Sequence, residues 1–283
     1  MKFVKIFLLF WISAGVAGAQ EVAAKKPLVV TSINPIYQIL LAITGDQNNS
    51  LRAMNPAISE HDYQLKKSDV EAVFRADLVF YVDDDLEKNF AKFLRGKKSY
   101  KLSEINGIKL LPARNDSKKI DPHLWMNPEN ALKIAEFMAK KISEIDEANA
   151  KKYQKNLAKF RKEIAETEKV IRDELLPIKG AGYVFFHDGY QYFEDYFGLK
   201  PLKVIVQNHE QELTIKEARE LDLLVRSGKV KCVFGDAYDE KNSAKKLARN
   251  YKIKFASLDL LGREGGYADL LLKIAEVMRG CLL

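Results

Sequence analysis

The sequence predicts an α/β protein of two lobes, each built on a parallel four-stranded sheet, with one long backbone helix joining them. Short apolar runs alternate with helical patterns before residue 128 and again after residue 176. Strands that are apolar along their whole length and separated by helices indicate parallel sheets buried on both faces. Between the two series, residues 129–176 contain neither Gly nor Pro and carry apolar residues at helical spacing. We expect the functional site in the cleft between the lobes, outside the carboxyl ends of the strands.

The N-terminal lobe is expected over residues 20–127. Its strands are rich in β-branched and aromatic residues. One of its helices should begin at Ser68 as N-cap, with Glu71 completing a capping box. The predicted strands are 28–31, 51–54 and 78–82, and the predicted helices are 35–44, a helix from residue 68, and 86–94.

The predicted connector covers residues 128–176. Lys and Glu are frequent in this stretch, and its apolar positions do not keep a strict heptad. We expect one long helix, or two in tandem, that would measure about 70 Å if unbroken. A stiff helix joining two lobes explains this pattern better than a coiled coil does.

The C-terminal lobe is expected over residues 177–283. Pro177 and Gly180 end the connector, and a second series of strands and helices begins. No sequence repeat relates the two lobes. The predicted strands are 182–186, 202–206, 230–234 and 255–258, and the predicted helices are 190–197, 214–225, 243–250 and 267–278.

The first residues have the features of a secretory signal peptide. Lys2 and Lys5 precede an apolar run, 6–16, that is too short for a membrane span. Ala17-Gly18-Ala19 then fits the small-residue cleavage signature, with cleavage near Ala19. Because no cysteine lies at this point, we expect no lipid anchor. The mature chain is predicted to be exported.

The charge of the chain does not indicate a nucleic-acid partner. The formal net charge is +7, but 46 basic and 39 acidic residues are interspersed. There is no arginine-rich block and no stripe of basic and aromatic residues of the kind that binds nucleic acids. The excess is interpreted as a solvated surface.

The chain has two cysteines, Cys232 and Cys281. An even count in an exported chain favours a disulfide, which would close a loop of about 50 residues. The chain-entropy description gives such a bond a stabilising contribution of roughly 4 kcal/mol as an upper value. A two-cysteine metal site is the alternative, but no other ligand residue neighbours either cysteine.

Several polar residues follow predicted strands or stand at the start of the connector. Each histidine alone is more often a structural residue than a ligand. Three of the four histidines of the chain, however, fall at loop positions of one predicted cleft. The residues concerned are His61, His123, His187, Asp236 and Asp259.

Three imidazoles and a carboxylate form a set suited to tetrahedral Zn²⁺. The N-terminal lobe would supply His61 and His123, and the C-terminal lobe would supply His187 and Asp259. His123 lies between Pro122 and Pro128, and this stiff, non-helical segment would hold its imidazole still. A Glu in place of one histidine would shift the preference towards manganese.

The motifs around these residues resemble those of metal-binding proteins of ABC importers, and within them the periplasmic zinc-binding proteins of the ZnuA type. The resemblance covers essentially the whole mature chain. It implies a periplasmic solute-binding protein with His61, His123, His187 and Asp259 as ligands, and it also implies the disulfide between the two cysteines. The motifs are Ser59-Glu60-His61-Asp62-Tyr63, Asp121-Pro122-His123-Leu124-Trp125, Phe186-His187-Asp188-Gly189-Tyr190 and Leu258-Asp259-Leu260-Leu261-Gly262.

The chain departs from the family pattern in two places. Members of the zinc branch often carry a loop rich in His before the second ligand, whereas residues 112–119 are short, basic and free of His. Proline is missing after Asp259, where the family usually has Asp-Pro-Leu-Gly, so Glu60 or a water molecule stays open as the fourth ligand. His209 matches no ligand motif and is expected in a loop near the cleft rim.

We therefore expect a monomeric periplasmic protein that captures Zn²⁺ and delivers it to the membrane permease of an ABC importer. Two alternatives remain open from the sequence. One is a manganese- or iron-binding member of the same family. The other is a zinc-dependent hydrolase using His61, His123 and His187 as metal ligands and Asp259 as general base.

Overall fold

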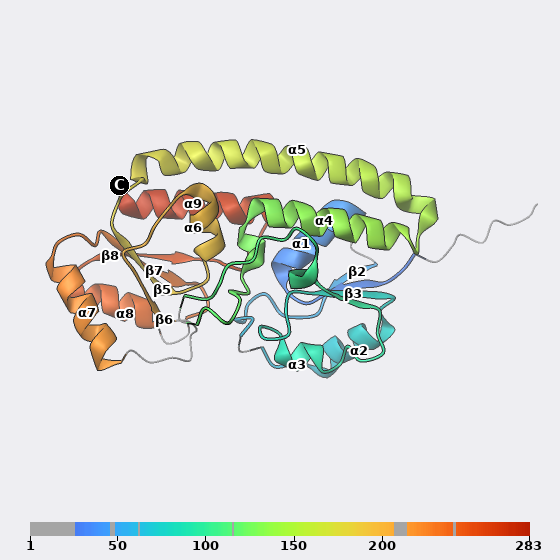
Figure 1. Ribbon diagram of the computed structural model, residues 1–283, viewed down its shortest axis with the longest axis horizontal. Coiled ribbons are helices and arrows are strands. Elements are labelled where there is room, and N and C mark those ends of the chain that lie inside the picture. The colour runs from blue at the N-terminus through green and yellow to red at the C-terminus, as the bar shows by residue number, and fades with distance from the viewer. Residues whose placement is uncertain (1–25, 46–48, 62, 115, 207–213, 240–241) are drawn as a thin grey trace, which may run out of the picture.

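The computed structural model contains two parallel four-stranded sheets, one in each lobe (Figure 1). It describes residues 26–45, 49–61, 63–114, 116–206, 214–239 and 242–283. Across those ranges, no helix is both long enough and apolar enough to cross a membrane. The predicted α/β fold of two lobes is confirmed. The predicted signal peptide lies outside the described residues.

Both sheets have the same strand order. In the N-terminal lobe the order is β2-β1-β3-β4, and in the C-terminal lobe it is β6-β5-β7-β8. All neighbouring strands run parallel, so each sheet presents the carboxyl ends of its strands at one edge. The strands are β1 Val29–Thr31, β2 Ser50–Arg52, β3 Leu78–Tyr81, β4 Ser99–Lys101, β5 Tyr183–His187, β6 Lys203–Val206, β7 Cys232–Asp236 and β8 Lys254–Leu258.

The central strands are the ones that the apolar runs predict. All residues of β1, β5 and β7 are buried, as are the first three of β3. The edge strand β4 was not identified from the sequence. Its residues Ser99, Tyr100 and Lys101 are only partly buried, so no continuous apolar run marks it.

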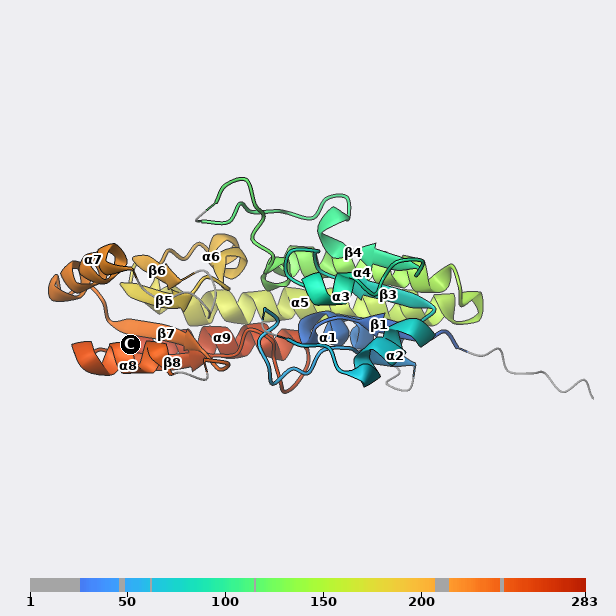
Figure 2. The same cartoon turned by 90° about the horizontal axis from the view of Figure 1, so that it is seen from below.

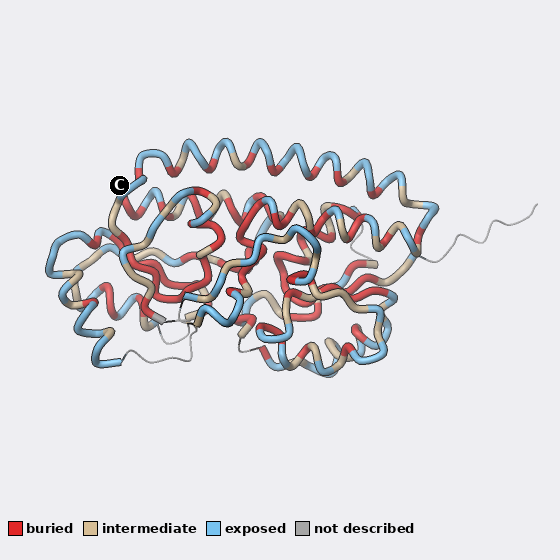
Figure 3. Tube along the Cα trace, in the orientation of Figure 1, coloured by how far each residue is buried: buried red, intermediate tan, exposed pale blue. Residues whose placement is uncertain are grey.

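Helix α5 (Ala150–Leu175) extends along both lobes and joins them (Figure 1). It packs on α1 (Asn34–Thr44) and α4 (Pro128–Ser143) in the N-terminal lobe and on α9 (Tyr267–Leu282) in the C-terminal lobe. Its buried positions recur every three or four residues and face the lobes (Figure 3). The predicted long joining helix is confirmed. The buried residues of α5 are Tyr153, Leu157, Phe160, Ile164, Thr167, Ile171 and Leu175.

The stretch predicted as one long helix, or two in tandem, forms two helices, so the length given for an unbroken helix does not apply. Helix α4 ends at Ser143, and the chain folds back before α5, placing the two helices side by side. Side chains in the turn compete with helical backbone hydrogen bonds. The carboxylate of Asp146 accepts hydrogen bonds from Asn149 Nδ2 (2.9 Å) and from the Tyr153 hydroxyl (2.6 Å).

The helix α2 (Lys67–Arg75) begins one residue before the predicted N-cap. Lys66 is the N-cap, and the side chain of Asp69 accepts its backbone N–H at 2.7 Å. The predicted capping box of Ser68 and Glu71 is therefore wrong, because the acceptor side chain stands three residues after Lys66. The other short helices are α3 Lys88–Ala91, α6 Gln191–Phe197, α7 Ile215–Arg226 and α8 Ser243–Tyr251, and the short 3₁₀ segment η2 is Leu124–Met126.

The lobes meet through buried hydrogen bonds as well as through α5. Trp125, in η2, is fully buried and donates from Nε1 to the Leu260 carbonyl (3.2 Å). The hydroxyl of Tyr267 donates to the Trp125 carbonyl (2.5 Å). Gln38 of α1 donates from Nε2 to the Gly262 carbonyl (2.6 Å). These contacts hold the cleft residues of the two lobes in one arrangement.

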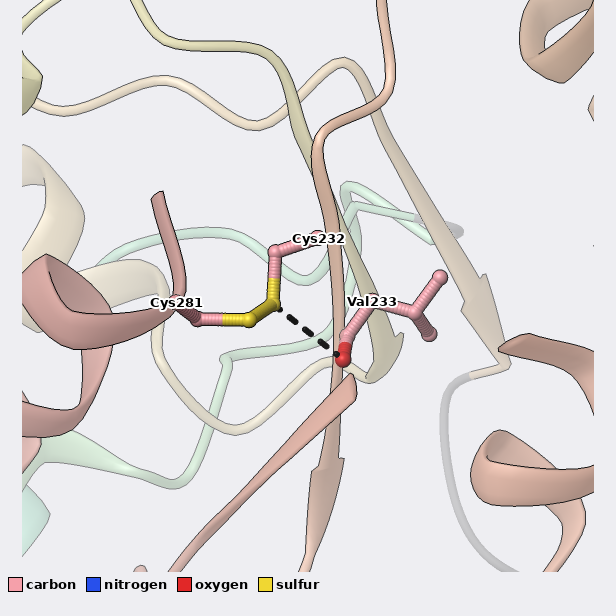
Figure 4. The surroundings of a disulfide bond; sticks show 3 residues. All are labelled: Cys232, Val233 and Cys281. Carbon is pink, nitrogen blue, oxygen red and sulfur yellow. Dashed lines mark hydrogen bonds between the residues drawn. A yellow bond between two sulfur atoms is a disulfide. The ribbon is translucent and has the colours of Figure 1, made fainter. Parts of the chain in front are cut away.

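The predicted disulfide is present. Cys232 on β7 is bonded to Cys281 near the end of α9, at a sequence separation of 49 (Figure 4). The bond links the sheet of the C-terminal lobe to the helix that packs on α5.

Replacing both cysteines, C232A with C281A, should lower the free energy of unfolding by up to about 4 kcal/mol, because the unfolded chain loses its cross-link. Urea denaturation of the metal-free double variant and of the oxidised protein measures this difference. The reduced wild-type protein is the control and should match the variant. A difference below about 1 kcal/mol would contradict the expectation.

Candidate metal centre

Three histidines from separate segments converge in the cleft. His61 lies in the loop after β2, His123 directly precedes η2, and His187 is the last residue of β5. One ring nitrogen of each lies within 4.8 Å of the others. The ring centroids are 5.3–5.5 Å apart. This spacing allows one ion to contact all three imidazoles.

Local structure positions each imidazole. Asn127, four residues after His123, is the N-cap of α4, and its side chain accepts the backbone N–H groups of Glu129 (2.8 Å) and Asn130 (3.2 Å). His187 extends from a central strand that is buried throughout. Two residues later, Gly189 leaves room for this ring, since a Cβ at Gly189 would lie 3.2 Å from Cε1 of His187.

The three histidines differ in exposure. His123 and His187 are almost fully buried, whereas 20% of the His61 side chain is exposed. A cavity of about 180 Å³ is lined by His61, His123, Asp121 and Asp188, among others. A larger cavity, of about 650 Å³, is lined by Glu60 and His61. The centre therefore opens to solvent beside His61.

Carboxylates orient the two buried rings. The Oδ1 atom of Asp121 lies 2.7 Å from Nδ1 of His123, and the Oδ2 atom of Asp236 lies 2.6 Å from Nδ1 of His187. The hydroxyl of Tyr190 donates to the other oxygen of Asp236 (2.6 Å). A carboxylate acceptor places the hydrogen on Nδ1, which leaves Nε2 of each ring to bind a metal.

The sequence predictions include no orienting role for Asp121 or Asp236. Asp121 stands two residues before His123, so a local motif could have indicated it. Asp236 is 49 residues from His187. The strand register explains why His187 and Asp236 are close. Phe185 on β5 pairs with Phe234 on β7, and His187 and Asp236 each stand two residues after these paired phenylalanines.

A carboxylate also lies among the imidazoles. The Oε1 atom of Glu60 is 3.4 Å from Nε2 of His123 and 3.6 Å from Nε2 of His61. Burial raises the pKa of Glu60, but the hydrogen bond with His123 and the charges of the histidines outweigh it and lower the pKa to about 2. Glu60 is thus an ionised carboxylate facing the site.

Asp259, the predicted fourth ligand, lies directly after β8 and is not among the three residues whose ligand atoms gather. Its carboxylate accepts the backbone N–H groups of Leu261 (3.1 Å), Gly262 (2.9 Å) and Arg263 (3.0 Å). The Tyr238 hydroxyl and Arg263 Nε donate to it as well. The carboxylate caps its own loop. His209 lies outside the described residues.

The sequence matches known proteins along nearly its full length. Residues 29–281 match the family described as zinc-uptake complex component A, periplasmic. The high-affinity zinc uptake system protein ZnuA of Brucella abortus (strain 2308) is 26% identical, over 97% of this chain and 98% of that protein. The iron-binding protein YfeA of Yersinia pestis is 28% identical, over 86% and 81%.

Solved structures have the same fold. A crystal structure of ZnuA superposes with a TM-score of 0.81 at 22% identity and covers 92% of this chain and 100% of that one. The AdcAII protein of Streptococcus pneumoniae superposes with a TM-score of 0.79 at 25% identity, over the same shares. The matched family is described as a zinc-uptake component, and the relatives are described as uptake or binding proteins, so the hydrolase alternative is not retained.

The site predicts a pH-dependent affinity for zinc. Burial lowers the pKa of His123, but the charge and hydrogen bond of Asp121, together with those of Glu60, outweigh it and raise the pKa to about 10. At neutral pH the metal-free protein therefore holds a proton on His123 that zinc must displace. Affinity should fall by at least about tenfold per unit as the pH decreases from about 8 to about 6.

Competition with a chelator of known protonation constants measures this dependence, and calorimetry in buffers of different ionisation enthalpy counts the released protons. A dissociation constant that stays flat across this range would refute the expectation.

Proposed function

The chain belongs to the ZnuA family of periplasmic zinc-uptake components, and from this premise we propose that it captures Zn²⁺ and delivers it to the membrane permease of an ABC importer. The observation that carries the proposal is the convergence of His61, His123 and His187, with the carboxylate of Glu60 beside the first two. The family comprises periplasmic metal-binding proteins of ABC importers. The choice of zinc, the permease and a monomeric state are part of the proposal.

Donor chemistry supports zinc as the cargo. Three imidazoles and one carboxylate suit Zn²⁺, whereas Mn²⁺ prefers a larger share of oxygen ligands. Relatives described as an iron-binding protein and as a metal ABC transporter substrate-binding lipoprotein, from Streptococcus cristatus, make iron or manganese the second candidate. The proposal of zinc rests on the donor atoms of this chain, three imidazoles and one carboxylate, and not on the names of these relatives.

We further propose Glu60 in place of Asp259 as the fourth ligand. Glu60 is buried, ionised and within 3.6 Å of two imidazole nitrogens. Asp259 could bind a metal only after giving up hydrogen bonds to its own loop and to Tyr238. Because the carboxylate oxygens of Asp259 already accept hydrogen bonds, we assign Asp259 to capping its loop. Because Glu60 is ionised and lies beside the imidazole rings, we assign it as the ligand.

Protein isolated directly from the periplasm should contain a single zinc ion per chain, and Zn²⁺ should displace Mn²⁺ at equal free concentration. Elemental analysis and competition titration measure both. Since zinc generally binds nitrogen-rich sites more tightly than manganese does, the metal content after export is the sharper observation. Manganese or iron in the isolated protein would overturn the choice of metal and leave the family assignment intact.

The fourth ligand can be identified with two isosteric variants. E60Q should weaken zinc binding by at least about tenfold, because the ionised oxygen is lost from the site. D259N should keep the affinity within about threefold of wild type, since Asn can still accept backbone N–H groups. Zinc affinities by chelator competition, with melting temperatures as a control for folding, measure both effects. A larger loss in D259N than in E60Q would assign the ligand to Asp259.

A further inference from the structure

The segment before His123 crosses from the N-terminal lobe to the C-terminal lobe. We call residues 109–114 and 116–121 the bridging loop; in Figure 2 it extends from the N-terminal lobe towards α6. The backbone N–H of Leu111 donates to the Tyr192 hydroxyl (2.9 Å), which itself donates to the Asp121 carbonyl (2.8 Å). Lys109 Nζ lies 2.5 Å from a carboxylate oxygen of Asp195. The loop is therefore fastened to α6.

Arg114 makes the most buried of these contacts. Its guanidinium donates to Asp188 from one nitrogen and to Glu194 from the other, the latter at 2.6 Å. Both carboxylates are almost fully buried. The hydroxyl of Tyr183 donates to the second oxygen of Glu194 (2.8 Å). A planar guanidinium can bond two separate carboxylates at once, which an ammonium group cannot do with the same geometry.

These contacts join the backbone segments that carry two ligands. Asp188 follows His187 directly in the chain. The bridging loop ends at Asp121, whose side chain orients His123. The charge of Asp121 also acts on Arg114 and on Asp188. The Arg114 cation thus interacts with Asp188, next to His187, and with Asp121, which orients His123.

We propose that Arg114 is a positioning residue, which holds the loop leading to His123 against the strand end carrying His187 and so slows the release of bound zinc. This inference rests on the proposed function. Arg114 acts through its ion pairs with Asp188 and Glu194, and its role is not that of a metal ligand.

Charge and position predict opposite effects when Arg114 is removed. A cation near the site repels Zn²⁺, so loss of the charge alone would tighten binding. Loss of the contacts of Arg114 with Asp188 and Glu194 would let the distance between His123 and His187 vary, and bound zinc would be released faster. Weaker binding in an Arg114 variant therefore reports positioning.

The test compares R114A and R114K with R161A as a matched control. Arg161 forms an exposed ion pair with Glu136 on the outer helices, at 2.9 Å. Stopped-flow transfer of zinc to a fluorescent chelator measures the dissociation rate. We expect release to be about tenfold faster in R114A, intermediate in R114K, and unchanged in R161A.

A measurement on metal-free protein separates this inference from the proposed function. Hydrogen exchange at the Leu111 amide should be faster in R114A than in wild type, because the loop is held less firmly to α6. If wild type bound no zinc, the proposed function would fail while the exchange experiment still tested the clamp. Should R114A not fold, R114K and E194Q carry the test, and both should release zinc faster than wild type.

Release from R114A that is as slow as from wild type, or slower, would overturn the inference. Unchanged exchange at Leu111 would overturn it as well. Faster release in R161A to the same degree would show a general effect of losing an arginine, and would also count against the assignment.

Discussion

The apolar stripe on α5 packs against helices of both lobes, and the geometry of the metal centre depends on that packing. His61 and His123 come from the N-terminal lobe, whereas His187 ends a strand of the C-terminal lobe. A shift of one lobe against the other would change the distances between their nitrogens. The hydrophobic interaction along the buried face of α5 has no preferred direction, but it is strong enough to hold the sheets of the two lobes in a fixed relative position. The buried hydrogen bonds of Trp125 and Gln38 then set the finer alignment.

A second constraint is the set of buried carboxylates around the metal centre between the two lobes. Asp121, Asp188, Glu194 and Asp236 are all buried, and each has a hydrogen-bonding partner within the cleft. Buried carboxylates are costly without such partners, and paired ones become rigid in a low-dielectric setting. The hydrogen-bonded carboxylates therefore have two effects. It orients the imidazoles, and it makes displacement of any one member unfavourable for its neighbours.

The sequence predicted the central strands, the joining helix and the three histidines, since each leaves a local pattern. Other features depend on particular side-chain contacts that leave no periodic pattern in the sequence. The turn before α5 uses side-chain bonds of Asp146 that no helical periodicity records. The pairing of His187 with Asp236 follows only once β5 and β7 are known to be neighbours in register. Asp259 follows its strand as predicted, but the capping of its own loop depends on local backbone conformation.

The unequal exposure of the histidines bears on how a competing ligand would exchange with a bound ion. Ligand substitution at a metal requires the incoming donor to approach the ion from an open side. Here that side is next to His61, because His123 and His187 are enclosed. A chelator would therefore first meet a bound ion beside His61, while His123, His187 and the buried carboxylate of Glu60 stay covered.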